Sequence, residues 1–454
     1  MALVSVATVA APVTAGDAGP GAPGVGDPFF PLEGNGGYDV RDYHLALTWD
    51  PATTTLSGTA RITAVATDPL TSFDLDLRGF DVSSVSVNRS AATFERDGQE
   101  LIITPAHPLR ARRPFVVVVQ YAGTPEVVVD PDGSWEGWIA SNDGTVALGE
   151  PQGTPAWFPA NDHPTDKATF SLAITVPGDL VAVSNGKPAR PTRRGDRTTY
   201  TWTEDKPMAT YLATLSIGHF TMSVSRTSSG LPVINAVGPG LEADSAAALA
   251  RIPEMIDWLR TIFGPYPFSS TGAIVVDAPD VGYALETQDR PTFTWAPDDL
   301  TMVHELAHQW VGNSVSVATW PEIWLNEGFA GYVEWMWTEH DGGPTADESF
   351  ADNYNSIPAD DPFWQLPIGP STLPDASELF AGQVYLRGAM TLQVLRTTIG
   401  DSAFFEVLRR WTTEHRYSTA STADFIALAE RVSQQQLDDL FTTWLDTPGK
   451  PALV

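Results

Sequence analysis

Two histidines stand four residues apart in the stretch HELAHQW, with a glutamate directly after the first. The surrounding segment APDDLTMVHELAHQWVGN (296–313) has a Pro-Asp start and a Gly-Asn end, which predicts a helix. Because residues i and i+4 share one face of a helix, His304 and His308 can direct their imidazole nitrogens at one metal ion. Glu305 then lies close to the ion without being required to bind it. This geometry is typical of a zinc hydrolase with two histidine ligands and a glutamate as general base.

A third ligand is available eighteen residues after His308. The segment WPEIWLNEGFAGYVEW (320–335) predicts a second helix after Pro321, and Glu327 lies near its start between apolar residues. Taken alone, Glu327 would be interpreted as a solvated acid at a helix start. Beside the two histidines it completes a His-His-Glu set, which leaves the fourth tetrahedral position of zinc to water. Glu334, seven residues later on the same face, either accepts the second N–H of a ligand histidine or lies at the surface.

HELAH followed at this distance by LNEGFA resembles the aminopeptidase N family of zinc metallopeptidases, the gluzincins of peptidase family M1. The resemblance extends from about Tyr38 to Val454, and it is to a short form without the C-terminal helical domain of many relatives. It implies one zinc ion per chain, held by His304, His308 and Glu327. It also implies a thermolysin-like, mostly helical catalytic domain.

Two segments resemble the parts of that family that bind the substrate amine. VGYALETQ (281–288) stands where the family carries Gly-Ala-Met-Glu-Asn: Ala284 and Glu286 match the motif, and Tyr283 departs from it. The block that begins EPQGTPAWFPAND places Glu150 on the family's second amine-binding acid. The resemblance therefore implies that Glu286 and Glu150 bind the α-ammonium of a peptide. Tyr283 and Ala284 are expected to line the pocket for its first residue.

A further segment, VYLRGAMTL (384–392), resembles the family's element around the catalytic tyrosine and assigns that role to Tyr385. In the implied mechanism Glu305 takes the proton of the attacking water and passes it to the departing amine. The Tyr385 hydroxyl stabilises the oxyanion. These sequence features predict a zinc-dependent aminopeptidase that acts on peptides with a free N-terminus.

Three other functions remain open. A thermolysin-type endopeptidase would use the same metal site and the same base. Epoxide hydrolysis occurs in one branch of the family, but no feature specific to it is evident in this sequence. A non-catalytic extracellular peptide-binding protein on the same scaffold is disfavoured, because the ligands, Glu305 and Tyr385 are all present.

Composition narrows the partners. The 454 residues carry 26 Lys and Arg against 56 Asp and Glu, a formal net charge of −30, which makes nucleic acid an unsuitable partner. There are no cysteines, so disulfides, thiolate zinc sites and cysteine nucleophiles are excluded. No segment has the length and apolar character of a transmembrane helix. The oligomeric state is not encoded in an obvious pattern, and a monomer is favoured.

The expected architecture is a multidomain α+β chain. Residues 1–37 are predicted to hold a signal remnant, MALVSVATVAAPVTA, and a flexible Gly- and Pro-rich linker; the remnant favours a secreted, extracellular protein. Alternating apolar runs with turn residues between them predict an N-terminal antiparallel all-β domain over 38–224. From 225 to 454 the periodicity becomes mostly helical, beginning with an amphipathic helix that ends at Gly264, and this range is the predicted catalytic domain.

Overall fold

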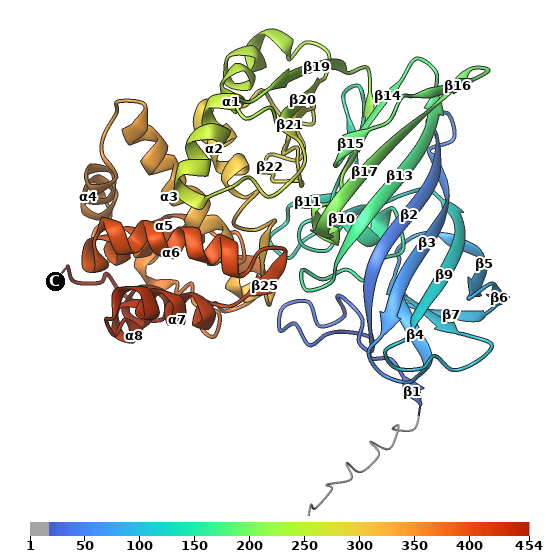
Figure 1. Ribbon diagram of the computed structural model, residues 1–454, viewed down its shortest axis with the longest axis horizontal. Coiled ribbons are helices and arrows are strands. Elements are labelled where there is room, and N and C mark those ends of the chain that lie inside the picture. Colours follow the sequence, from blue (N-terminus) through green and yellow to red (C-terminus); the bar gives the residue numbers. More distant parts are fainter. Residues whose placement is uncertain (1–17, 454) are drawn as a thin grey trace, which may run out of the picture.

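The computed structural model describes residues 18–453 and divides into a strand-rich part and a helix-rich part (Figure 1). Three β-sheets form the N-terminal part, and eight α-helices lie within the described residues, all of them after residue 241. The predicted fold class, a β domain followed by a mostly helical domain, is confirmed. Within the described residues no helix combines the length and the apolar run that a bilayer crossing requires.

The largest sheet follows from period-two alternation. Along β13 every second side chain, from Ala168 to Val176, is buried, while the residues between them are only partly covered. In this sheet one pairing differs from the predicted antiparallel order, since β2 and β13 run parallel, with Leu45 opposite Leu172. The strands at 19–20 and 70–76 form a second parallel pair, in a smaller sheet. The sheet order is β15-β17-β13-β2-β3-β9-β5-β6, with β16 paired to β17. Its strands are β2 (Tyr38–Asp50), β3 (Thr55–Ala66), β5 (Asp81–Val87), β6 (Ser90–Ala91), β9 (Pro114–Gly123), β13 (Lys167–Pro177), β15 (Lys187–Pro188), β16 (Thr192–Arg194) and β17 (Arg197–Ala209).

Two smaller sheets complete the N-terminal part. The first has the order β1-β4-β8-β7, with β1 (Gly19–Pro20), β4 (Leu70–Asp76), β7 (Thr93–Asp97) and β8 (Glu100–Thr104). The second has the order β10-β11-β12-β18-β14, with β10 (Val127–Val129), β11 (Trp135–Ser141), β12 (Gly144–Leu148), β14 (Val181–Ser184) and β18 (Leu215–Gly218). The second sheet matters for function because β12 leads directly into Glu150.

A mixed sheet opens the helix-rich part. Its order is β19-β20-β21-β23-β22, with β19 (Thr221–Arg226), β20 (Pro232–Val237), β21 (Thr271–Val275), β22 (Ala284–Leu285) and β23 (Thr292–Phe293). The expected domain boundary at 224/225 falls inside β19. Because β19 pairs only with β20, the chain changes from one set of sheets to the other before Thr221.

The first two helices contact this sheet, and the helices pack against one another (Figure 1). They are α1 (Glu242–Phe263), α2 (Asp299–Ala307), α3 (Trp324–His340), α4 (Ala346–Ser356), α5 (Gly382–Ile399), α6 (Asp401–Glu414), α7 (Thr422–Ser433) and α8 (Asp438–Phe441). A short parallel pair, β24 (Val315–Val317) with β25 (Ser418–Ala420), joins the segment after α2 to the segment before α7. Helix α1 ends at Gly264, whose φ of 89° suits glycine, as the sequence predicts.

The segment from residue 18 to residue 37 is packed, which corrects the prediction of a flexible linker. Asp27 is buried and accepts hydrogen bonds from the backbone N–H groups of Phe30 and Trp320, at 3.1 and 2.8 Å. The Phe30 ring packs edge-on against the Trp320 ring. A Gly- and Pro-rich composition therefore does not prevent order here, because a few anchoring side chains supply the contacts. The predicted signal remnant, 1–15, lies outside the described residues.

Candidate metal centre

The two histidines of HELAH lie at the end of α2. Asp298 caps the helix, because its side chain accepts a 2.8 Å hydrogen bond from the backbone N–H of Thr301. The helix ends at Ala307 and is shorter than the predicted segment. The chain turns after His308, and Gly312 has a φ of 115° that a side chain would make unfavourable. Both imidazoles are buried, and their ring centroids lie 4.9 Å apart.

Glu327 in the first turn of α3 reaches the same point. Its Oε2 lies 3.3 Å from Nε2 of His304 and 3.4 Å from Nε2 of His308. One ligand atom from each of these three residues falls within 4.8 Å of the others. The three predicted ligands therefore converge on a volume that one ion can occupy.

The outer nitrogens of both rings have partners that suit a metal site. Nδ1 of His304 is 2.6 Å from Oε1 of Glu334, and Nδ1 of His308 is 3.1 Å from the carbonyl oxygen of Val311. Since both partners accept, each Nδ1 can donate its proton there, which would leave the lone pair of each Nε2 to a metal ion. Two such nitrogens and a carboxylate are the donor set of a catalytic zinc site. The residues present thus fit zinc.

Tyr385 reaches the site from α5. Its ring stacks beside the His304 ring, with centroids 6.0 Å apart and an interplanar angle of 26°. Burial, together with the charges of Glu327 and other nearby carboxylates, holds the pKa of Tyr385 well above its usual range. The phenol therefore stays protonated and can donate a hydrogen bond.

A cavity of about 710 Å³ opens over these groups and contains the other predicted site residues. Glu305 lines it, and burial raises the pKa of this carboxyl to about 7, partly offset by the two histidines. Tyr283 and Ala284 line it as well.

Two buried acids line the same cavity. Glu286 is 3% exposed and Glu150 is 9% exposed, and one carboxylate oxygen of each has no hydrogen-bond partner. Burial and the nearby charge of Glu286 hold the pKa of Glu150 well above its usual range. No lysine or arginine lines the cavity within the part of the chain that the structure describes. The two acids therefore have no lysine or arginine partner among the described residues that line the cavity.

The position of Glu286 depends on two amides that the sequence motifs did not single out. Its backbone carbonyl accepts hydrogen bonds from Nε2 of Gln309 at 3.1 Å and from Nδ2 of Asn313 at 2.7 Å. The loop that carries Asn313 is held in turn by Lys167, whose Nζ donates to the Asn313 carbonyl at 2.9 Å. Gln309 and Asn313 lie within the five residues after HELAH, and this proximity is the only sequence feature that could have indicated their role.

Comparison with known proteins agrees with this arrangement over both parts of the chain. Residues 298–444 match the family described as the peptidase family M1 domain, and residues 40–212 match the peptidase M1 N-terminal domain. This chain belongs to peptidase family M1. The family expected from HELAH and LNEGFA is thereby confirmed.

Solved structures of family M1 are similar along almost the whole chain. The crystal structure of an M1 zinc metallopeptidase from Deinococcus radiodurans is 32% identical, with a TM-score of 0.86, over 95% of this chain and 99% of that one. A glutamate-to-alanine mutant from the same organism, bound to a Tyr-Ser-Ala substrate, is 31% identical with a TM-score of 0.86, over 95% of this chain and 100% of that one.

Curated M1 relatives are longer. Aminopeptidase M1-C of Oryza sativa subsp. japonica is 28% identical over 65% of this chain and 36% of its own length. Glutamyl aminopeptidase of Bos taurus is 26% identical over 79% of this chain and 40% of its own length. The chain thus spans about two fifths or less of these relatives.

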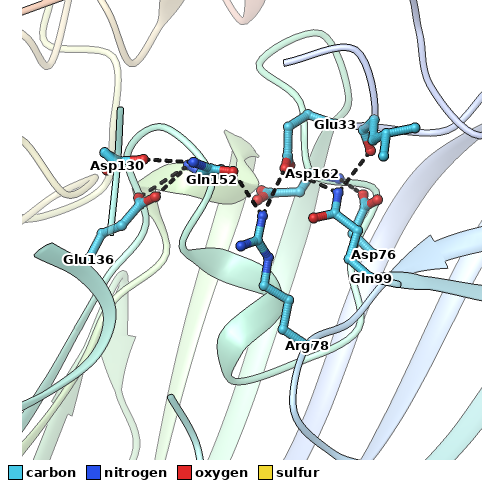
Figure 2. Close-up of polar contacts among 9 residues, drawn as sticks. Glu33, Asp76, Arg78, Gln99, Asp130, Glu136, Gln152 and Asp162 are labelled. Atoms are coloured by element: carbon cyan, nitrogen blue, oxygen red, sulfur yellow. Dashed lines mark hydrogen bonds and ion pairs between the residues drawn. The ribbon is translucent and has the colours of Figure 1, made fainter. Parts of the chain in front are cut away.

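In this M1 member a polar network fixes the loop that carries Glu150 (Figure 2). Gln152 is its centre: the backbone N–H donates to the Glu136 carboxylate at 3.1 Å, and Nε2 donates to Asp130 at 2.8 Å. Oε1 of Gln152 accepts from Arg78 at 2.8 Å. Oε1 of Glu150 has no hydrogen-bond partner. The loop that carries Glu150 is therefore held by the hydrogen bonds of Gln152, two residues later.

Proposed function

We propose that this chain is a zinc-dependent aminopeptidase, which removes the first residue of peptides with a free N-terminus. The observation that carries the proposal is the pair Glu286 and Glu150, buried beside a His-His-Glu set with carboxylate oxygens that lack partners. A peptide's α-ammonium supplies the missing cation. An internal or blocked peptide leaves both acids unpaired, which is costly in a buried site.

The side chains around the cavity suit this hydrolysis. When bound to His304, His308 and Glu327, zinc would polarise the scissile carbonyl and lower the pKa of a water molecule. Glu305 accepts the proton of the attacking water and gives it to the departing amine. The Tyr385 hydroxyl donates a hydrogen bond to the oxyanion, and one such donor contributes roughly 3 kcal/mol. Glu334 holds the tautomer of His304 that leaves Nε2 free.

The names of similar proteins support the same reaction. The curated relatives are aminopeptidases, and one solved neighbour, similar along 95% of this chain, was crystallised with a tripeptide substrate. A thermolysin-type endopeptidase would use the same metal ligands, but it has no use for the two buried acids. Secretion depends on residues 1–15, which lie outside the described residues, and secretion and a monomeric state both stay predictions.

One assay separates the proposal from its rival. A peptide amide with a free amine and its N-acetylated twin are incubated with the zinc-loaded protein, with and without a chelator. The expected result is chelator-sensitive release of the first residue from the free peptide alone. Equal cleavage of both peptides would favour an endopeptidase and would contradict the proposal.

A further inference from the structure

The cavity wall beside Glu286 and Glu150 contains an aromatic ring, Tyr283, and a further carboxylate, Asp132. We propose that the first subsite selects arginine and lysine, with the side chain lying along the Tyr283 ring and its cation at the Asp132 carboxylate. This inference rests on the proposed aminopeptidase function and adds the substrate class to it.

Tyr283 links the two amine-binding acids to the hairpin β10–β11. It lies three residues before Glu286, and its hydroxyl donates a 2.7 Å hydrogen bond to the carbonyl oxygen of Trp135 in that hairpin. The hydroxyl is therefore anchored, and the ring lines the cavity in a fixed orientation. A side chain that leaves a Cα next to the bound amine meets this wall. Aromatic faces attract the guanidinium and ammonium groups of arginine and lysine.

Asp132 stands in the turn of the same hairpin and also lines the cavity. Its Oδ1 accepts hydrogen bonds from the backbone N–H and the hydroxyl of Ser134, at 2.8 and 2.6 Å. The turn is closed by a further 3.0 Å bond from the N–H of Asp130 to the carbonyl oxygen of Ser134. One carboxylate oxygen thus fixes the side chain, and Oδ2 has no hydrogen bond within the described residues. That oxygen is free for a substrate cation.

Carboxyl groups outnumber basic groups behind this wall, where Arg78 lies near Asp130 and donates to Gln152. Burial and then the charges of Glu136, Asp130, Glu150 and Asp132, in that order, hold the pKa of Tyr283 well above its usual range. Four carboxyl groups thus lie near one ring, although burial raises the pKa of Glu136 and Glu150 well above the usual range, so these two add little negative charge. No lysine or arginine of the described residues lines the cavity. A positively charged side chain gains from this field, whereas a negatively charged one is repelled.

The same cavity has an apolar side, formed by Trp295, Leu300 and Phe380, which offers a rival reading. If the first side chain lay there, leucine, methionine and phenylalanine would be preferred. Tyr283 favours the acidic wall, because it lies three residues before Glu286 in the chain and near the Glu150 carboxyl group. The test must therefore separate charge from size.

Uncharged isosteres provide that separation. The kcat/KM values of fluorogenic amides of arginine and citrulline, and of lysine and norleucine, are measured with the zinc-loaded full chain. We expect arginine to exceed citrulline, and lysine to exceed norleucine, by up to about fivefold, the value of one exposed ion pair. The ratio should fall as salt is added. Equal values within each pair would overturn the inference. Failure to hydrolyse any of the four would instead overturn the proposed function.

The variant Asp132→Asn tests the residue itself. Asparagine keeps an oxygen that can accept both hydrogen bonds from Ser134, so the turn should persist while the charge is lost. We expect the arginine-to-citrulline ratio to fall towards one, with the citrulline value unchanged. Asp360→Asn, at an exposed aspartate outside the cavity, should leave the ratio as it is. A ratio that Asp132→Asn does not change would remove Asp132 from the subsite. If that variant did not fold, the salt dependence of the native ratio would still decide whether charge is recognised.

Discussion

Gly328 and Gly388 lie in direct backbone contact where α3 crosses α5. A Cβ atom built on Gly388 would lie 2.7 Å from the Cα of Gly328, and one built on Gly328 would lie 2.8 Å from the Cα of Gly388. Gly328 follows the metal-site residue Glu327, and Gly388 lies three residues after Tyr385. The glycines of LNEGFA and YLRG therefore set the distance at which the carboxylate and the phenol face the same cavity.

Gly388→Ala should separate the two helices and displace Tyr385 from the metal site. Overpacking of this kind costs roughly 1–3 kcal/mol, and small displacements of a catalytic group lower rates by up to about 100-fold. We expect kcat to fall more than zinc affinity, as measured by steady-state kinetics and metal titration. Gly382→Ala on the same helix, where a Cβ meets nothing within 4 Å, is the matched control. Unchanged kcat in Gly388→Ala would contradict the role given to this contact.

Glu334→Gln should weaken zinc binding without removing a ligand. The carboxylate holds the proton on Nδ1 of His304, and loss of such a partner lowers metal affinity by about 10–100-fold. Competition with a chromophoric chelator measures the change directly. Glu339→Gln, at an exposed position of the same helix, should retain the native affinity. Native affinity in Glu334→Gln would reduce that contact to a surface ion pair.

Gln152→Leu should impair recognition of the α-amine. The change removes the bonds to Asp130 and Arg78 and frees the loop that carries Glu150. We expect KM for free-amine substrates to rise about tenfold, the equivalent of one or two hydrogen bonds, with little change in zinc content. The exposed Gln436→Leu is the control. If kcat fell while KM stayed native, the loop would not act through Glu150.

Asp162 should make stability depend on pH near neutrality. Burial raises the pKa of this carboxyl to about 7, with hydrogen bonds and Arg78 offsetting part of the effect, whereas the ordinary value for an aspartate is 3.8. The folded state therefore holds more protons than the unfolded state between these two values. The contribution of the protonated Asp162 carboxyl to the free energy of unfolding is therefore complete below about pH 4. It is lost as the pH rises through about 7.

The variant Asp162→Asn removes this penalty. The Tm of the variant minus the Tm of the native protein should increase by several degrees from pH 5 to pH 8. The estimate follows because 1 kcal/mol corresponds to roughly 2–4 °C in domains of 150–250 residues. Scanning calorimetry of both proteins measures the difference, with Asp360→Asn as an exposed control. A Tm difference independent of pH would show that Asp162 is ionised in the folded state.

The sequence predicts the local parts of this protein well. Helix periodicity and capping residues locate α2 and α3, so the approach of His304, His308 and Glu327 follows from spacing over a short range. The contacts that support the site join distant segments and leave no periodic signal. Asp27 accepts from the N–H of Trp320 across 293 residues, and Lys167 donates to the Asn313 carbonyl across 146. Such pairings depend on sheet register and domain packing, which local sequence patterns do not specify. The Gly- and Pro-rich composition of residues 18–37, for example, predicts a flexible linker and gives no sign of the contact between Asp27 and Trp320.

The most direct test of the proposed mechanism compares metal content with turnover in two variants. Glu305→Gln should keep one zinc ion per chain and lose roughly 10²–10⁴-fold in kcat, because only the proton acceptor is removed. Glu327→Gln should lose both zinc and activity. Near-native turnover by Glu305→Gln, or full zinc retention by Glu327→Gln, would contradict the assignment of base and ligand in this site.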